Sequence, residues 1–206
     1  MNPTLRRSAL LIRLHVIVVL AGLLTVTGTQ IAPRAGLGTA GGLLASAFTA
    51  ASFTGALTFR RNPPWDQVFF LTSAFLLGFL LPSIFGWRDP GRYLWRPAIL
   101  AIGGLATSAG AGRGMRAGFR TLAPALWVLS LVYWIGWFVL GLTAAGTIVQ
   151  VAWSAGGYVV FWGLAASWAA GLSWVELDRN PMQKGLELYL LVLNLLLSAH
   201  TMLRPI

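Results

Sequence analysis

Seven apolar stretches, each about as long as a bilayer is thick, fill nearly the whole of this 206-residue chain. A helix needs roughly 20 apolar residues to cross the hydrocarbon core of a membrane, and no soluble domain of this size could hide seven such stretches. The pattern predicts an all-α, polytopic membrane protein, a bundle of about seven transmembrane helices forming a single domain over residues 1–206. The predicted spans are 8–29, 38–59, 66–86, 94–112, 121–142, 150–173 and 186–203.

The composition agrees with a membrane location and argues against several function classes. Charged residues make up only 10% of the chain, against about 25% in soluble domains. The net charge is +10, but the arginines are scattered over the loops, so we expect no nucleic-acid partner. The absence of cysteine excludes disulfides, thiolate nucleophiles and thiolate metal sites. Fourteen arginines against one lysine, with much alanine, glycine and leucine, indicate a GC-rich bacterial genome.

The first apolar run is interpreted as a retained spanning helix. It extends from Ser8 to about Ala32, which is longer than the apolar region of about 7–15 residues in a signal peptide. Basic residues gather on the cytoplasmic side of membrane proteins. Those on the N-terminal side are Arg6, Arg7, Arg13, Arg60, Arg61, Arg113, Arg116, Arg120, Arg179 and Lys184. The opposite side has Arg34, Arg88, Arg92, Arg96 and Arg204. The excess predicts a multi-pass protein of the bacterial inner (plasma) membrane with a cytoplasmic N-terminus, although the loop around Arg88 opposes it.

Two of the predicted spans, 38–59 and 94–112, are rich in small residues. Small residues stand four apart at Gly41 and Ala45 in the first of them, and at Gly104, Ser108 and Gly112 in the second. Such spacing lets helix backbones approach closely in a membrane. We expect these two helices near the centre of the bundle. The alternative is that the small residues line a cavity or a cofactor.

The chain offers almost no residues for catalysis at membrane depth. The five acids all lie at predicted helix ends or in loops: Asp66, Asp89, Glu176, Asp178 and Glu187. Chemistry in a membrane needs ionisable groups that face the bundle interior. No Gly-x-Ser-x-Gly elbow, His-Glu-x-x-His motif or P-loop occurs. The sequence therefore predicts a protein that is not an enzyme and has no metal site.

Three polar side chains inside the predicted spans have two interpretations each. His15 and His200 lie toward opposite faces of the membrane, so they are not expected to share a metal or a haem. Each could ligate a tetrapyrrole singly. The alternative for each is a hydrogen bond to a neighbouring helix or a position at the membrane interface. Asn194, with Ser198 one turn later, is expected to hydrogen-bond a neighbouring helix rather than a ligand.

Ten tryptophans are many for this length. Several lie near predicted helix ends, where aromatic rings anchor at the headgroups. Trp134, Trp137, Trp153, Trp162 and Trp168 lie deeper. The first two form an aromatic patch with Tyr133, to which Trp162 and Trp168 could add. These rings are expected to pack in the core or against lipid. The alternative is contact with a flat apolar ligand such as a pigment, quinone or sterol.

Four short motifs along the chain are Phe59-Arg60-Arg61, the stretch 71–82, the turn 112–116 and the stretch 188–195. Together they resemble the transmembrane Bax inhibitor family, seven-helix proteins whose bacterial members look like pH-sensitive calcium leak channels. Phe59-Arg60-Arg61 resembles the family's basic turn, and the stretch 71–82 follows it at similar spacing. The turn 112–116, Gly-Arg-Gly-Met-Arg, resembles the family's turn before the fifth helix. The stretch 188–195, Leu-Tyr-Leu-Leu-Val-Leu-Asn-Leu, is close to its last-helix signature. The resemblance implies a shared fold over most of the chain.

The resemblance breaks at the family's sensor, a pair of aspartates on the sixth and last helices. Their positions fall near Trp168 and at Leu191, which are apolar here. Arg60, whose counterpart can pair with the sensor, keeps its charge, and Glu176 and Asp178 are the nearest acids that could act as a gate. The resemblance therefore implies the fold without the calcium-gating aspartates.

Two functions remain open from the sequence. The first is a Bax-inhibitor-like ion leak pathway or stress regulator. The second is a non-catalytic accessory subunit of a larger membrane complex that packs helices and binds lipid, quinone or pigment. The partners expected are the lipid bilayer and other membrane-protein subunits.

Overall fold

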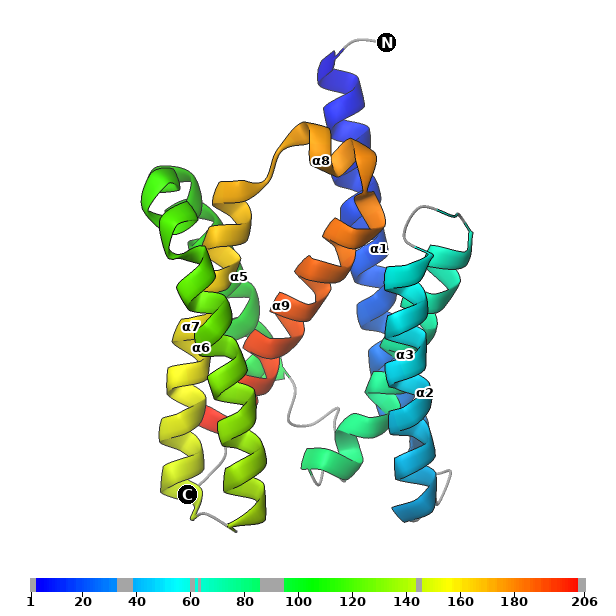
Figure 1. The fold of residues 1–206 in the computed structure, drawn as a ribbon, viewed down its shortest axis with the longest axis vertical. Helices are drawn as coiled ribbons and strands as arrows, with labels where there is room; N and C mark the ends of the chain where they lie inside the picture. The colour runs from blue at the N-terminus through cyan, green and yellow to red at the C-terminus, as the bar shows by residue number, and fades with distance from the viewer. Residues whose placement is uncertain are drawn as a thin grey trace. The chain divides into compact units, whose positions relative to one another are not determined.

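The computed structural model describes residues 3–32, 39–59, 62, 64–85, 95–143 and 146–203, in which helices are the only regular secondary structure (Figure 1). The helices are α1 (Pro3–Ile31), α2 (Thr39–Thr58), α3 (Trp65–Phe85), α5 (Trp95–Gly114), α6 (Arg116–Leu142), α7 (Thr147–Gly171), α8 (Trp174–Arg179) and α9 (Pro181–Met202). The all-α prediction is confirmed. Each predicted span coincides with one long helix, and the ends differ by no more than five residues. The short helix α8 lies outside the predicted spans.

Five of the described helices are long and apolar enough to cross a membrane, which is compatible with a multi-pass membrane protein. The stretches are Ser8–Ile31, Trp65–Pro82, Arg116–Trp137, Thr147–Gly171 and Pro181–Met202. Helix α5 is not among them, because its glycines, its serine and threonine and its two arginines lower its apolar content. A count of seven spans stays a prediction.

Contacts along the chain group the helices into two compact units. Unit 1 comprises Met1–Pro90 and Ser173–Tyr189, and unit 2 comprises Gly91–Leu172 and Leu190–Ile206. The boundary between them falls inside α9, so the first part of α9 packs in unit 1 and the rest in unit 2. All five acidic residues of the chain belong to unit 1, whereas unit 2 contains no aspartate or glutamate.

In unit 1, α3 packs against both α1 and α2. Helices α1 and α3 approach closely where a glycine of each faces the other's backbone. A Cβ added to Gly28 would overlap the backbone at Phe75 and Phe79, and one added to Gly78 would overlap the Thr25 carbonyl. This is the close contact that small residues permit between helices in lipid. Any larger side chain at either glycine would push α1 and α3 apart.

A buried polar contact joins the first part of α9 to α1 and α3. The Thr25 hydroxyl lies 2.8 Å from the Ala21 carbonyl oxygen and 3.0 Å from that of Ala74. It is also 2.7 Å from the Tyr189 hydroxyl. Because Thr25 has one proton to donate to a carbonyl, it accepts the proton of Tyr189. Phe70 packs edge-on against the Tyr189 ring, with ring centroids 5.5 Å apart.

In unit 2, α7 packs against both α5 and α6. Helix α5 runs parallel to α7, since Gly104 faces Tyr158 and, two turns later, Gly112 faces Ala166. The small-residue stripe of α5 is buried at Ala101, Gly104, Ser108 and Gly112. Between the two interpretations of this stripe, the contacts favour close helix packing, because its glycines face α7 directly.

Within each unit, the small-residue helices α2 and α5 are not the central ones, and their place in the whole bundle stays a prediction. The helices with extensive contacts to two neighbours are α3 and α7. A stripe of small residues gives a helix one close interface, such as the buried face of α2 at Ala45, Thr49, Ser52 and Ala56. A central helix must offer two interfaces, which requires buried residues on more than one face.

Candidate functional site

An aromatic cluster in unit 2 is centred on Tyr133 of α6, which is 6% exposed. Its ring meets Phe161 edge-on, with centroids 5.3 Å apart, and lies parallel to the Trp153 ring at 6.1 Å. Trp134 and Trp137 contact the same ring at 6.0 and 6.5 Å. Each such pair contributes beyond the area it buries. The predicted patch on α6 is therefore one side of a cluster completed by Trp153 and Phe161 of α7.

Two glycines make room for these rings. A Cβ at Gly136 would overlap the Trp153 ring, and one at Gly157 would overlap the Tyr133 ring. The polar atoms of the rings also have partners: the Trp153 indole N–H donates to the Tyr133 carbonyl oxygen at 3.1 Å, and the Tyr133 hydroxyl lies 3.2 Å from the Ser198 hydroxyl. The rings of Tyr133 and Trp153 thus pack directly against one another between α6 and α7.

The other two tryptophans considered as ligand contacts lie further along α7. Trp162 packs against Phe119 with ring centroids 6.0 Å apart, and its indole N–H donates to the Thr107 hydroxyl at 2.9 Å. Trp162 and Trp168 both border the apolar cluster of unit 2. That cluster also contains Leu191, so Trp168 and Leu191 share one apolar environment.

The second notable feature of unit 2 is the α5–α6 turn with its three arginines, Arg113, Arg116 and Arg120, called the arginine turn below. The Nε atoms of Arg116 and Arg120 both donate to the carbonyl oxygen of Ala170, at 2.8 and 3.1 Å. The last carbonyls of a helix have no partner within the helix, and cations are favourable there. The two arginines therefore hold the end of α7 through one shared oxygen.

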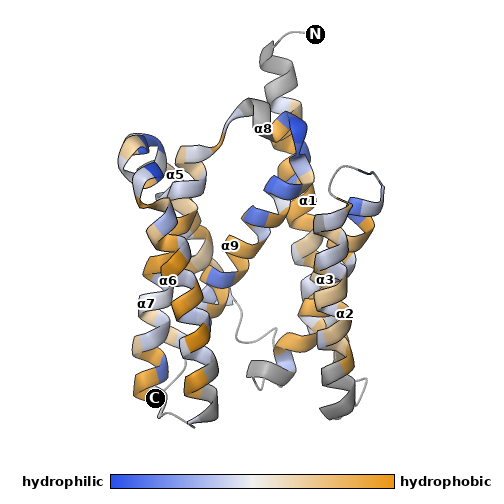
Figure 2. Ribbon diagram, in the orientation of Figure 1, coloured by the Kyte–Doolittle hydropathy of each residue, from blue (hydrophilic) through white to orange (hydrophobic). Residues whose placement is uncertain are grey.

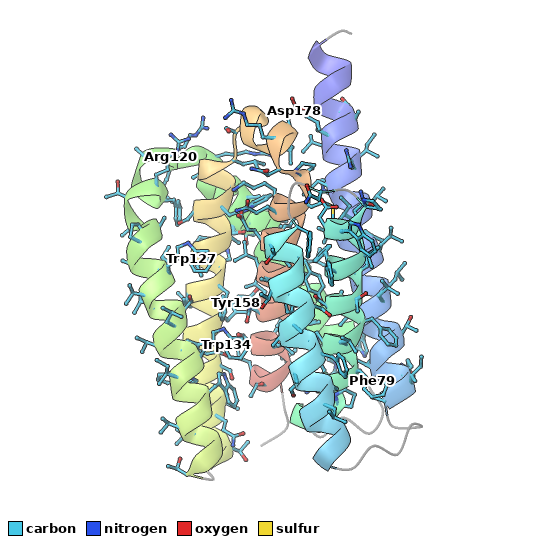
Figure 3. All side chains as sticks on the ribbon, turned by 45° about the vertical axis from the view of Figure 1, so that its right-hand side comes forward. Phe79, Arg120, Trp127, Trp134, Tyr158 and Asp178 are labelled. Carbon is cyan, nitrogen blue, oxygen red and sulfur yellow. The ribbon has the colours of Figure 1, made fainter. Side chains whose placement is uncertain are left out.

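Apolar and polar contacts fix the start of α6 against the end of α7. Phe119 is buried in a small cluster with Ala166 and Ala170. The Ser167 hydroxyl donates to the Phe119 carbonyl oxygen at 2.9 Å. The backbone that carries Arg116 and Arg120 is thus held in place, while both side chains are exposed. Figure 3 shows Arg120 at this end of α6, with Trp127 and Trp134 further along the helix.

Ser154 of α7 is an unusual buried group. Its side chain is fully buried, and its hydroxyl oxygen has no hydrogen-bond partner. Most buried hydroxyls in proteins are paired. It lies one residue after Trp153, on the helix that supplies two of the five rings of the aromatic cluster.

Of the three residues considered as a gate, the structure describes the side chain of Asp178 alone. Arg60 lies outside the described residues. Glu176 is in α8, and its side chain also lies outside the described part. Asp178 is exposed on α8 (Figure 3). No group of three or more histidine, cysteine or acidic side chains within reach of one metal ion occurs among the described residues.

The polar side chains of the spans turn mainly to their own helices. His15 is exposed on α1 and its Nδ1 lies 2.7 Å from the Leu11 carbonyl oxygen, whereas His200 is half-buried in the last turn of α9. The two histidines belong to different units. Asn194 differs from its expectation: its Nδ2 donates to the Leu190 carbonyl oxygen at 2.7 Å, one turn back in α9, rather than to a neighbouring helix. A backbone carbonyl at this position is within reach of the short amide side chain without any neighbour.

No protein-family model matches the chain, and no curated protein sequence is similar to it.

Trp153 and Phe161 belong to the aromatic cluster, but the sequence alone did not assign them to it. The spacing of residues along α7 contains a signal for both. Trp153, Gly157 and Phe161 stand four residues apart and so share one face of the helix. That face could be recognised as aromatic with a gap at the glycine. The shared carbonyl at Ala170 carries no such signal, because any helix end has free carbonyls.

Proposed function

We propose that this chain is a non-catalytic subunit of a larger membrane assembly and acts by packing helices. The observation that carries the proposal is the set of hydrogen-bond partners of the polar side chains in its apolar helices. Many of their hydroxyl groups donate to carbonyl oxygens of their own helix one turn earlier, as Thr27, Thr49, Ser73, Ser130 and Thr201 do. Asn194 does the same.

Such bonds use the hydrogen-bond donors of these side chains, so few donors are left for chemistry or transport. A path for ions or protons needs polar groups that face one another or a water-filled space. A hydroxyl that donates its proton to its own helix has no proton left to donate to a passing anion or to a proton relay. The contacts between helices rely instead on close approach at glycines, as between Gly78 and Thr25 or Gly112 and Ala166.

Large apolar side chains cover the outer faces of two helices and give the proposal a surface. On α1 they include Ile12, Val19 and Leu23, which are 63%, 59% and 59% exposed. On α6 they include Leu131 and Ile135, which are 63% and 64% exposed. Figure 2 shows the hydrophobic middle of both helices. Faces of this kind suit the bilayer or the helices of another membrane subunit.

The orientation proposed with this function follows the arginines. The N-terminus and the arginine turn lie in the cytoplasm of a bacterial cell, and the α6–α7 connection lies outside its inner membrane. Ten basic residues on the cytoplasmic side against five on the other support this orientation.

A second candidate is a leak protein of the Bax inhibitor kind. It is supported by the seven described helices of 20 residues or more and by the shared apolar environment of Trp168 and Leu191. That environment supplies no carboxylate, whereas calcium prefers several oxygen ligands. The second candidate therefore predicts a leak that does not respond to pH through an aspartate pair.

Reciprocal isolation tests the first candidate. The chain is tagged, extracted in a mild detergent and purified, and the membrane proteins that accompany it in fixed ratio are identified. One of them is then tagged in turn. The proposal expects the chain to return at the same ratio, and the complex to lack visible absorbance unless a pigment-binding partner is present. Recovery of the chain alone in both directions would contradict it, and a flux of ions through liposomes containing only the chain would favour the second candidate.

A further inference from the structure

We propose that Arg116 and Arg120 bind the phosphate group of an anionic phospholipid at the membrane surface. The first observation is the shared acceptor of the two side chains. Both Nε atoms lie within hydrogen-bonding distance of the Ala170 carbonyl oxygen, so they are at most about 6 Å apart. Two cationic groups are thus held side by side before any ligand arrives.

The bond to Ala170 leaves most of each guanidinium available. It uses only the Nε–H group, and each side chain keeps the four N–H bonds of its two Nη atoms. Both residues are exposed. A planar guanidinium matches the oxygens of a phosphate with two parallel hydrogen bonds. The pair can therefore donate to one phosphate from two sides.

Unit 2 has an excess of positive charge that no acidic residue of its own can neutralise, which favours the binding of an anion. Its basic residues include Arg96 and the three arginines of the arginine turn, and it has no aspartate or glutamate. Arg113 is exposed three residues before Arg116 and adds to the same positive charge. Two like charges this close repel each other, and a bound phosphate would relieve that repulsion.

The position of the arginine turn favours a lipid as the source of the phosphate. The exposed apolar face of α6 begins at Leu122, two residues after Arg120, and continues through Trp127. Figure 2 shows the hydrophilic turn beside the hydrophobic part of α6. Exposed tryptophans and the ends of spanning helices lie at the level of the headgroups. A phospholipid beside α6 would place its acyl chains on the apolar face and its phosphate at Arg120.

Native mass spectrometry of the full chain in an uncharged detergent tests this proposal. The probes are dihexanoyl-phosphatidylglycerol, dihexanoyl-glycerol with the same acyl chains and no phosphate, and inorganic phosphate. The proposal expects phosphatidylglycerol to bind at least tenfold more tightly than dihexanoyl-glycerol. Raising the salt concentration should weaken only the former, because salt screens exposed charges.

Two variants locate the site. The double substitution R116Q/R120Q is expected to weaken phosphatidylglycerol binding by about thirtyfold, as two basic residues near an anionic headgroup predict. The control R96Q removes an exposed arginine that stacks on Trp95 at the start of α5, and should change binding less than twofold. If the double variant does not fold, as its tryptophan fluorescence would reveal, the salt dependence and the lipid comparison on the unaltered chain decide the matter.

Three results would overturn the proposal. The first is equal affinity for phosphatidylglycerol and dihexanoyl-glycerol. The second is full binding by a folded R116Q/R120Q variant. The third is displacement of phosphatidylglycerol by an equal concentration of inorganic phosphate, which would assign the arginines to a soluble phosphate compound instead of a lipid.

Discussion

The close approach of α5 to α7 makes Gly112→Ala the sharpest test of the packing. The added Cβ would overlap the carbonyl oxygen of Ala166, a backbone atom that cannot swing aside. Helices α5 and α7 would separate by about 1 Å at this point, and a gap of that size forfeits up to half of the dispersion energy of the atoms concerned. Overpacking of this kind costs about 1–3 kcal/mol.

Gly110→Ala is the matched control. It adds the same methyl group to the same helix two residues earlier, where nothing lies within 4 Å of the new Cβ. Alanine favours a helix over glycine by up to about 1 kcal/mol. We therefore expect Gly110→Ala to be neutral or stabilising. For a chain of this size each 1 kcal/mol shifts the melting temperature by about 2–4 °C. A cost of about 2 kcal/mol lowers the melting temperature of Gly112→Ala by about 4–8 °C.

The assay is thermal unfolding in detergent, followed by tryptophan fluorescence, with both variants and the unaltered chain measured together. Trp162 reports on the interface directly, because its indole N–H bridges from α7 to Thr107 of α5. A Gly112→Ala variant that melts at or above the temperature of Gly110→Ala would show that the two helices do not pack as described.

Four further expectations follow from the same contacts. Tyr189→Phe removes the hydrogen bond to Thr25 and should cost about 0.5–1.5 kcal/mol in thermal unfolding; an unchanged melting curve would place the hydroxyl outside a buried bond. Asn194→Leu should cost less than about 1 kcal/mol, because the amide bonds only its own helix, and a large loss would reveal a partner on another helix. In the proposed orientation an impermeant maleimide added outside should label Gly146→Cys and not Gly118→Cys, both of which are exposed with open space around them; the reverse pattern would invert the topology. Liposomes containing the chain alone should show no calcium uptake that switches with pH, and robust switching would argue for a sensor outside the apolar cluster.

Hydrophobic length predicts most of the helices, because a run of apolar residues as long as a bilayer has few alternatives to a helix. Helices α6 and α9 each begin five residues before the predicted start, and both differences have the same cause. Helix α6 begins at Arg116 and α9 at Pro181, in polar segments that hydropathy assigns to loops. Arginine is a good helix former and proline suits the first turn. Charge alone therefore does not mark the end of a helix.

The pairing of helices is harder to predict from the sequence. The small residues of α5 at Gly104 and Gly112 indicate a close interface, but nothing local says that α7 supplies Tyr158 and Ala166 to it. Which helices become neighbours depends on contacts between segments far apart in the chain. The same reason hides Trp153 as the partner of the Tyr133 ring.

The arginine turn shows a different limit. The basic residues are plain in the sequence and predict a cytoplasmic side. Their shared bond to Ala170 depends on where α7 ends and on Phe119 packing beside it. Such a site arises from the fold and not from a motif.

The most direct test of the proposed function is the mass of the particle that contains this chain in its own membrane. Native membrane vesicles are ejected into a mass spectrometer without prior purification, and the chain is followed through a single cysteine placed at Gly118, since it has no other cysteine to react. The proposal predicts a particle that contains the chain together with different membrane proteins in fixed ratio. A particle that contains only copies of this chain would contradict it.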